Sequence, residues 1–146
     1  MNLQHMSEVE TVYLDGLNGF EFEQLCERIF HRAGWGSVER IGGVGDGGRD
    51  LIIHKRNGEE IVVECKHQPD SAIGRPIVQK LHSAVVSTGA DAGIIITTGR
   101  YSQKAIEHAK ILSEDTPIDL FDLLRLTELA WKAQIKLVIG LSLIHI

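Results

Sequence analysis

Two short aliphatic runs on either side of an Asn-Gly pair constrain this chain more than any other feature. Residues 51–53 are Leu-Ile-Ile, residues 61–63 are Ile-Val-Val, and Asn57-Gly58 lies between them. Asn-Gly supplies the positive φ angles of a tight hairpin turn, and β-branched residues favour strands. The pattern predicts two antiparallel strands joined near residue 58.

Alternation along the second of these strands places Glu64 and Lys66 on one side and Cys65 on the other, in the core. A turn near residue 58 also brings Asp50, at the far end of the first strand, roughly opposite residues 64–66. Two carboxylates and an ammonium then meet at one end of the strand pair. Taken alone, the Glu-x-Lys spacing favours a solvated pair on an exposed strand, since it occurs often by chance.

The three side chains have the chemistry of a magnesium-dependent phosphodiesterase site. Carboxylate oxygens of Asp50 and Glu64 could share a hard cation with a substrate phosphate. Such a metal polarises the phosphoryl oxygen and acidifies a bound water. The Lys66 ammonium could orient or deprotonate the attacking water, or counter the charge that grows in the transition state.

A glycine-rich loop precedes Asp50, with five glycines between residues 42 and 48. Glycine permits positive φ angles and close approach of other backbone. Dinucleotide-binding loops run from a strand into a helix, whereas this loop runs into the strand at residues 51–53. We therefore exclude a dinucleotide site.

Four motifs resemble the Mrr-type catalytic domain of the restriction-endonuclease-like PD-(D/E)xK nucleases. They are Gly-x-x-Phe-Glu at residues 19–23, Asp-Gly-Gly-Arg-Asp at 46–50, Glu-Cys-Lys at 64–66 and Ile-Ile-Ile-Thr-Thr-Gly at 94–99. The resemblance implies an α/β fold, a three-layer αβα domain around a central mixed sheet of about five strands. It also implies cleavage of DNA with magnesium, for which manganese could substitute.

Carried over by position, the resemblance implies that Asp50, Glu64 and Lys66 are catalytic, with Asp50 and Glu64 as the metal ligands. It also implies that Glu23 is the acidic residue of the first helix. Many relatives have Gln where this chain has Glu64, so the carboxylate at this position in this chain favours metal binding.

Helical spacing of apolar residues predicts an amphipathic helix that Asn18 caps, with Glu21 completing a capping box and Gly34 ending the run. Glu23 lies at the margin of its apolar stripe, where it either faces solvent or leans toward the metal. Trp35 is expected to pack in the core.

The rest of the chain predicts a mixed sheet with helices on both sides. We expect a strand near 38–41, a loop at 71–74, a helix after Arg75-Pro76 and a buried strand at 93–98. A helix capped by Ser102, a strand at 118–121 and a closing helix from Asp122 should follow. The apolar pattern extends that last helix to Ile135, with Thr127 as a possible internal restart.

Candidates for DNA contact come from the loop and from the helix that follows the Glu-x-Lys strand. They are Asp46, Arg49, Arg75, Gln79 and Lys80. For the last three, a position that simply faces water is the favoured alternative. The formal net charge of −5 argues against tight unassisted binding to a duplex. Basic residues are expected to concentrate around the site: Arg40, Arg49, Lys55, Arg56, Lys66, Arg75 and Lys80.

We divide the chain into a leader or tag at 1–16 that could be disordered, an Mrr-like endonuclease domain at 17–130, and a C-terminal extension at 131–146. That extension could be truncated or non-native. Two cysteines without disulfide or zinc spacing favour a reducing compartment, so we expect a cytoplasmic location. The apolar run at residues 137–146 is too short to cross a bilayer.

These observations predict a magnesium-dependent DNA endonuclease of the restriction or defence type. Its partner is DNA, with recognition supplied by a homodimer partner or by a fused or partner domain, and no small-molecule cofactor is expected. Two alternatives stay open: a Holliday-junction-type structure-selective resolvase, and a catalytically inactive nuclease-fold module that binds DNA or acts as a scaffold.

Overall fold

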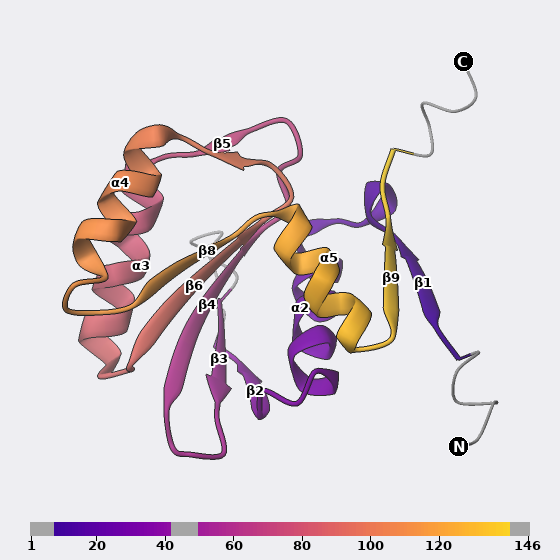
Figure 1. Ribbon diagram of the computed structural model, residues 1–146, viewed down its shortest axis with the longest axis horizontal. Helices are drawn as coiled ribbons and strands as arrows, with labels where there is room; N and C mark the ends of the chain where they lie inside the picture. Colours follow the sequence, from indigo (N-terminus) through magenta and orange to yellow (C-terminus); the bar gives the residue numbers. More distant parts are fainter. Residues whose placement is uncertain (1–7, 42–49, 141–146) are drawn as a thin grey trace.

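A computed structural model describes residues 8–41 and 50–140 of the chain. Figure 1 shows a central sheet with helices α3 and α4 on one side and helices α2 and α5 on the other. A separate two-stranded ribbon, β1 and β9, lies beyond α2 and α5. The expected α/β fold with three αβα layers is confirmed.

The central sheet has five strands in the order β2-β3-β4-β6-β8. They are β2 (Ser37–Arg40), β3 (Asp50–His54), β4 (Glu60–Lys66), β6 (Ala92–Thr97) and β8 (Ile118–Phe121). The predicted hairpin is present, since β3 and β4 are antiparallel and Gly58 has a φ of 94°. β4, β6 and β8 run parallel, so the sheet is mixed.

The helices begin close to the residues at which the sequence predicts them to start, and Asn18 and Ser102 are the predicted caps. Asn18 and Glu21 form a reciprocal capping box at the start of α2 (Gly19–Arg32). Pro76 lies in the first turn of α3 (Arg75–Thr88), and Ser102 caps α4 (Gln103–Leu112). Asp122 caps α5 (Leu123–Lys132), accepting a hydrogen bond from the Arg125 amide.

Two apolar cores separate the layers. The α2/α5 core includes Phe22, Leu51, Val63, Cys65 and Leu126, and Trp35 packs against it, as expected. The α3/α4 core is smaller, and contains Val62, Val78, Leu81, Val85, Ile95, Ala105, Ala109 and Ile118. Successive β4 residues enter opposite cores, so each face of the sheet can be identified from its neighbours.

Close packing of α3 on the sheet depends on Gly93 in β6. A Cβ atom at this position would lie 2.9 Å from Val85 Cγ2 and 3.0 Å from Leu81 Cγ. Glycine therefore lets the helix approach the strand more closely than a larger residue would.

Residues at both ends of the described chain pack onto the domain, which corrects the expectation of a leader ending at residue 16. Strands β1 (Glu10–Tyr13) and β9 (Ile135–Val138) pair in parallel, and a 3-10 turn, η1 (Leu14–Gly16), follows β1. Leu14 and Ile135 are fully buried in the α2/α5 core. Pairing between residues more than 120 positions apart leaves no local signal in the sequence.

Three further expectations about local structure are wrong. The expected loop at 71–74 contains β5 (Ala72–Ile73), which pairs in parallel with β7 (Arg100–Tyr101). The closing helix ends at Lys132, and Ile135 begins a strand instead of extending the helix. Thr127 does not restart the helix, because its hydroxyl donates to the Leu123 carbonyl one turn earlier, at 2.7 Å.

No helix within the described parts of the chain has the length and apolar character needed to cross a membrane.

Candidate active site

Glu64 and Lys66 lie together at the carboxyl end of β4. Lys66 Nζ is 3.3 Å from Glu64 Oε1, and the side chains are only 17% and 4% exposed. Both occupy the face of the sheet that α3 and α4 partly cover, because Val62, two residues earlier, belongs to the α3/α4 core. The alternative of a solvated pair on an exposed strand is therefore excluded.

The residue between them has the packing role that the alternation predicts. Cys65 is 6% exposed and belongs to the α2/α5 core on the opposite face of the sheet. The polar side chains of β4, Glu64 and Lys66, therefore project from one face of the sheet, while Cys65 packs in the larger core on the other.

Asp50 is the direct partner of Glu64 in the antiparallel register of β3 and β4. Residues at directly opposed positions share a face of the sheet and have Cβ atoms about 4.5–5.5 Å apart. The register therefore places position 50 on the face that carries Glu64 and Lys66. The side chain of Asp50 lies outside what the structure describes.

The Glu64 carboxylate has an incomplete hydrogen-bond environment. Its Oε1 atom is buried and accepts no hydrogen bond from the described residues, although the Lys66 ammonium is close by. A buried carboxylate normally recruits donors or a cation because an ionised group loses hydration in the interior. The Glu64 carboxylate therefore offers an oxygen ligand, the type that a hard cation prefers, and its Oε1 atom is not occupied by a hydrogen bond.

Glu23 is buried on α2 at 2% exposure, so a solvated surface position is excluded. Arg40 Nε lies 3.7 Å from Glu23 Oε1 and 3.3 Å from Glu27 Oε1. Arg40 is opposite Leu51 in the register of β2 and β3, and Leu51 belongs to the α2/α5 core. Glu23 thus meets an arginine on the α2 side of the sheet, and its approach to a metal stays a prediction.

The described side chains contain no group of three or more His, Cys, Asp or Glu residues that could hold a metal ion. The Asp50 side chain is not among those described, so the pairing of Asp50 with Glu64 rests on backbone register alone.

His67, which the sequence analysis missed, connects the end of β4 to α2. Its ring stacks on Phe22 with centroids 5.0 Å apart, and Nδ1 lies 3.0 Å from Thr98 Oγ1. Strand alternation from Cys65 would have placed residue 67 on the α2 side. The Thr-Thr-Gly motif thus contacts the Glu-x-Lys strand, because the Thr98 amide also donates to the Lys66 carbonyl at 3.2 Å.

The candidate DNA contacts divide into two groups. Arg75, Gln79 and Lys80 are exposed on α3, whereas Asp46 and Arg49 lie outside the described residues. The expected concentration of basic residues needs one correction. Lys55 and Arg56 lie at the hairpin turn, at the opposite end of β4 from Lys66, roughly 20 Å away at 3.3 Å per residue.

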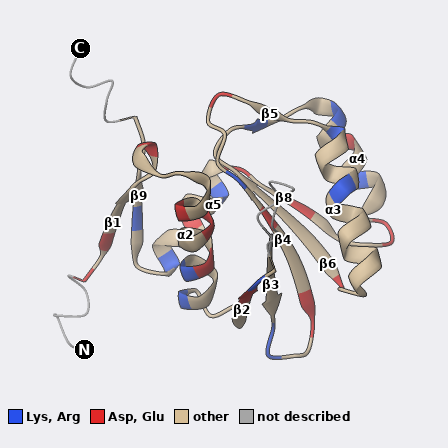
Figure 2. Cartoon of the chain, turned by 180° about the vertical axis from the view of Figure 1, so that it is seen from behind, with Lys and Arg blue, Asp and Glu red and all other residues tan. Residues whose placement is uncertain are grey.

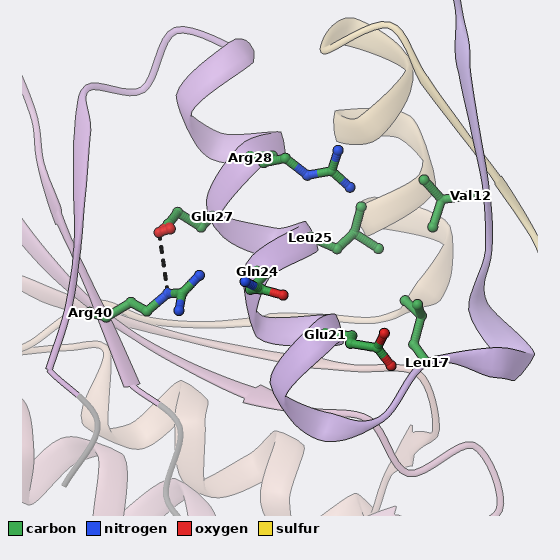
Figure 3. A pocket seen from close by; sticks show the side chains of 8 residues that line it. All are labelled: Val12, Leu17, Glu21, Gln24, Leu25, Glu27, Arg28 and Arg40. Atoms are coloured by element: carbon green, nitrogen blue, oxygen red, sulfur yellow. Dashed lines mark ion pairs between the residues drawn. The ribbon is translucent and has the colours of Figure 1, made fainter.

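A hollow of about 350 Å³ lies against α2, between β1 and Arg40 of β2 (Figure 3). Its lining residues are Val12, Leu17, Glu21, Gln24, Leu25, Glu27, Arg28 and Arg40. Neither Glu64 nor Lys66 reaches it. Because the chemistry lies elsewhere, we do not assign this hollow as the active site.

The chain is similar to known restriction enzymes in both sequence and fold. The type IV methyl-directed restriction enzyme EcoKMrr of Escherichia coli (strain K12) is 33% identical over 95 residues. The match covers 61% of this chain but only 31% of that enzyme. The solved structure of the DNA modification-dependent restriction endonuclease AspBHI superposes with a TM-score of 0.55 at 20% identity. That superposition covers 80% of this chain and 34% of AspBHI, and shows a shared fold.

A model of the Mrr catalytic family, described as restriction endonuclease, matches residues 14–130. The matched region includes α2, the β3–β4 hairpin that carries Glu64 and Lys66, and the Thr-Thr-Gly motif. This chain belongs to the Mrr-type restriction endonuclease family.

Proposed function

We propose that this chain is the catalytic domain of a magnesium-dependent DNA endonuclease. The observation that carries the proposal is the register of β3 and β4, in which Asp50 opposes Glu64 while Lys66 Nζ lies 3.3 Å from Glu64 Oε1. One short strand pair thus brings two carboxylate positions and an ammonium to one end of one sheet face. Family membership supports phosphodiester hydrolysis as the reaction.

Asp50 and Glu64 would hold the metal, with Glu64 contributing a buried carboxylate that has unused acceptor capacity. When bound, magnesium would supply Lewis-acid activation of the phosphate and its attacking water. Glu23, which lies on the α2 side of the sheet, is proposed as the helix acid that approaches this site.

Lys66 has a role of its own. Its ammonium is largely withdrawn from water, so its charge acts through a less polar medium than bulk solvent. It would orient the water that attacks phosphorus and counter the negative charge that grows on the phosphate oxygens. The bond from water oxygen to phosphorus forms as the bond from phosphorus to the leaving ester oxygen breaks. The attacking water gives up a proton, and the leaving oxygen acquires one.

The substrate is proposed to be DNA, in a cytoplasmic restriction or defence setting, with recognition supplied outside this domain. The match covers less than a third of EcoKMrr, a methyl-directed enzyme, so a similar parent protein would have room for a recognition domain. The net charge of −5 supports the same division, since an acidic domain gains little from counterion release on a duplex.

Plasmid cleavage tests this proposal. Purified protein is incubated with supercoiled plasmid, with the same plasmid methylated, and with a four-way DNA junction, each with magnesium, manganese or a chelator. We expect metal-dependent nicking or linearisation, abolished by chelation and by Asp50→Asn, Glu64→Ala or Lys66→Ala. Glu60→Ala, at the other end of β4, is the matched control and should retain activity.

The substrates separate the remaining alternatives. Preferential cleavage of the junction would replace the restriction-type proposal with a resolvase. DNA binding without turnover in any metal would indicate an inactive module. Full activity of Glu64→Ala would contradict the assignment of the site itself.

A further inference from the structure

Basic side chains gather where the β5–β7 ribbon leads into α3 and α4. The parallel pairing of Ala72–Ile73 with Arg100–Tyr101 places the starts of α3 and α4 directly after neighbouring strands. Arg75, Lys104 and His108 line one hollow there, together with Glu107 and Ile111. The two helices therefore share a surface at their amino-terminal ends.

This surface departs from the acidic character of the chain. Neither α3 nor α4 has an acidic residue in its first turn. Figure 2 shows blue segments on the β5–β7 ribbon, α3 and α4. We define the ribbon patch as Arg75, Arg100 and Lys104, all of them exposed. Two acids border it: Glu107 accepts a 3.4 Å hydrogen bond from Gln103 Nε2, and the exposed Asp70 precedes Ser71, whose carbonyl accepts from the Arg100 amide.

The ribbon patch lies near the candidate active site because the backbone links them tightly. Thr97 is the register partner of Lys66, and the Arg100 amide donates to the Ser71 carbonyl at 3.1 Å. Three residues span at most about 11 Å and neighbouring strands are about 5 Å apart. The Cα atom of Arg100 is thus within roughly 16 Å of that of Lys66, which equals the rise of about five base pairs.

The position of this connection is fixed by packing. A Cβ atom on Gly99 would collide with the carbonyl oxygens of Gln68 and Ser71, so residues 68–71 and 99 lie in backbone contact. Arg100 therefore projects from a segment whose spacing from Lys66 is held by both backbone hydrogen bonds and close packing.

From these observations we propose that the ribbon patch binds the DNA backbone a few nucleotides from the bond that is cut. The inference rests on the proposed function and deepens it, because it names where the duplex leaves the Asp50–Glu64–Lys66 site. Phosphates are the ligand: the patch offers cationic groups on two helices and a strand, and its side chains supply affinity and orientation instead of base recognition.

The test measures binding separately from cleavage. Wild-type protein in chelator is titrated into a fluorescein-labelled 30-base-pair duplex over a series of salt concentrations. The variant Arg100→Ala/Lys104→Ala removes two patch charges, and Lys132→Ala/Lys136→Ala removes two exposed charges from α5 and β9. Both variants have the same net charge, so a difference between them reports position.

Counterion release predicts that loss of two phosphate contacts lowers the salt slope by about 1.8 and weakens binding up to roughly 60-fold at 0.1 M salt. We expect this change for Arg100→Ala/Lys104→Ala and a much smaller one for Lys132→Ala/Lys136→Ala. Melting temperatures of both variants should match that of the wild type, since the removed side chains are exposed.

Equal affinities and slopes for the two variants would overturn the inference, and so would the absence of wild-type binding at low salt. Failure of the proposed function is a different result: the wild type would bind the duplex through the patch and cut no DNA in any metal.

Discussion

Glu64 Oε1 and Lys66 Nζ lie 3.3 Å apart at the carboxyl end of β4, in surroundings that leave little water around either group. Such a pair costs desolvation, which the attraction between the two charges only partly offsets. The fold retains it on the face opposite the larger α2/α5 core, next to the register position of Asp50.

Lys66→Met should abolish cleavage and also destabilise the protein, because it leaves the buried Glu64 carboxylate without its cation. Loss of one partner of a buried pair costs on the order of 3–5 kcal/mol in the free energy of unfolding. The double variant Glu64→Gln/Lys66→Met should recover most of that stability but no activity. Urea unfolding and plasmid cleavage measure the two properties separately.

Two results would contradict this prediction. Unchanged stability of Lys66→Met would show that the buried Glu64 carboxylate is not stabilised by the Lys66 ammonium. Cleavage by the double variant would show that neither group takes part in the reaction.

Gly99→Ala should destabilise the connection between the Thr-Thr-Gly motif and β4. The added Cβ would meet the carbonyl oxygens of Gln68 and Ser71, which are backbone atoms and must move with their chain. We expect a loss of at least about 1–3 kcal/mol by overpacking. Gly16→Ala is the control, since a Cβ there meets nothing within 4 Å. Equal melting temperatures for the two variants would disprove the close approach.

Local patterns predicted the parts of this fold that local interactions stabilise. The Asn57-Gly58 turn, the capping box of Asn18 and Glu21, and the alternation that separates Cys65 from Glu64 all act within a few residues. Each is visible in sequence because its physical cause is short-range. The same reasoning brought Glu64 and Lys66 together and put Asp50 opposite Glu64.

Non-local pairings were not predictable in this way. β5 and β7 contain two residues each, and β1 and β9 four each, so none presents a periodic pattern long enough to recognise. The contact between Arg40 and Glu23 joins two elements whose relative position only the packed core determines. The expected basic cluster failed at Lys55 and Arg56 for a simpler reason, since a hairpin places its turn at the opposite end from its open strand ends.

Glu10→Gln should reveal how β1 is held to α2. Glu10 accepts hydrogen bonds from Arg28 at 2.7 Å and Arg32 at 3.0 Å, and the Arg28 bond is the main cause that lowers the Glu10 pKa below its ordinary value of 4.5. A lowered pKa stabilises the fold above pH 4.5, and this contribution is lost as the pH falls through the folded value. Because the groups are more than a third exposed, we expect less than about 1 kcal/mol.

Urea midpoints at pH 7 and pH 3 measure this contribution. The difference between wild type and Glu10→Gln should be present at pH 7 and shrink at pH 3. Glu8→Gln, at an exposed neighbouring position, should show no such difference. A gap between wild type and Glu10→Gln that stays constant with pH would rule out the ion pairs as its cause.

Tyr101 ties β6 to β8 at the end of the sheet near the ribbon patch. Its hydroxyl oxygen lies 2.9 Å from the Ile95 carbonyl and 2.6 Å from the Phe121 carbonyl, so its proton can be donated to either. Burial is the main cause that raises the pKa of Tyr101 above its ordinary value of 10.0, and the charges of Asp122 and Asp119 add to it. Tyr101→Phe should cost about 1–3 kcal/mol, since two carbonyls lose their donor.

The raised pKa fixes the sign of the pH dependence. Because the neutral phenol is favoured in the folded state, the stability from Tyr101 is complete below pH 10.0 and is lost as the pH rises above that value. Tyr101→Phe should therefore be less stable than wild type at pH 7, and the gap should narrow at alkaline pH. Tyr13→Phe, at a position 53% exposed, retains the buried hydroxyl and should follow the wild-type profile. Unfolding followed by circular dichroism between pH 7 and pH 11 measures the difference in stability between wild type and Tyr101→Phe. A difference that widens with pH would show that the Tyr101 hydroxyl does not stabilise the fold by donating to these carbonyls.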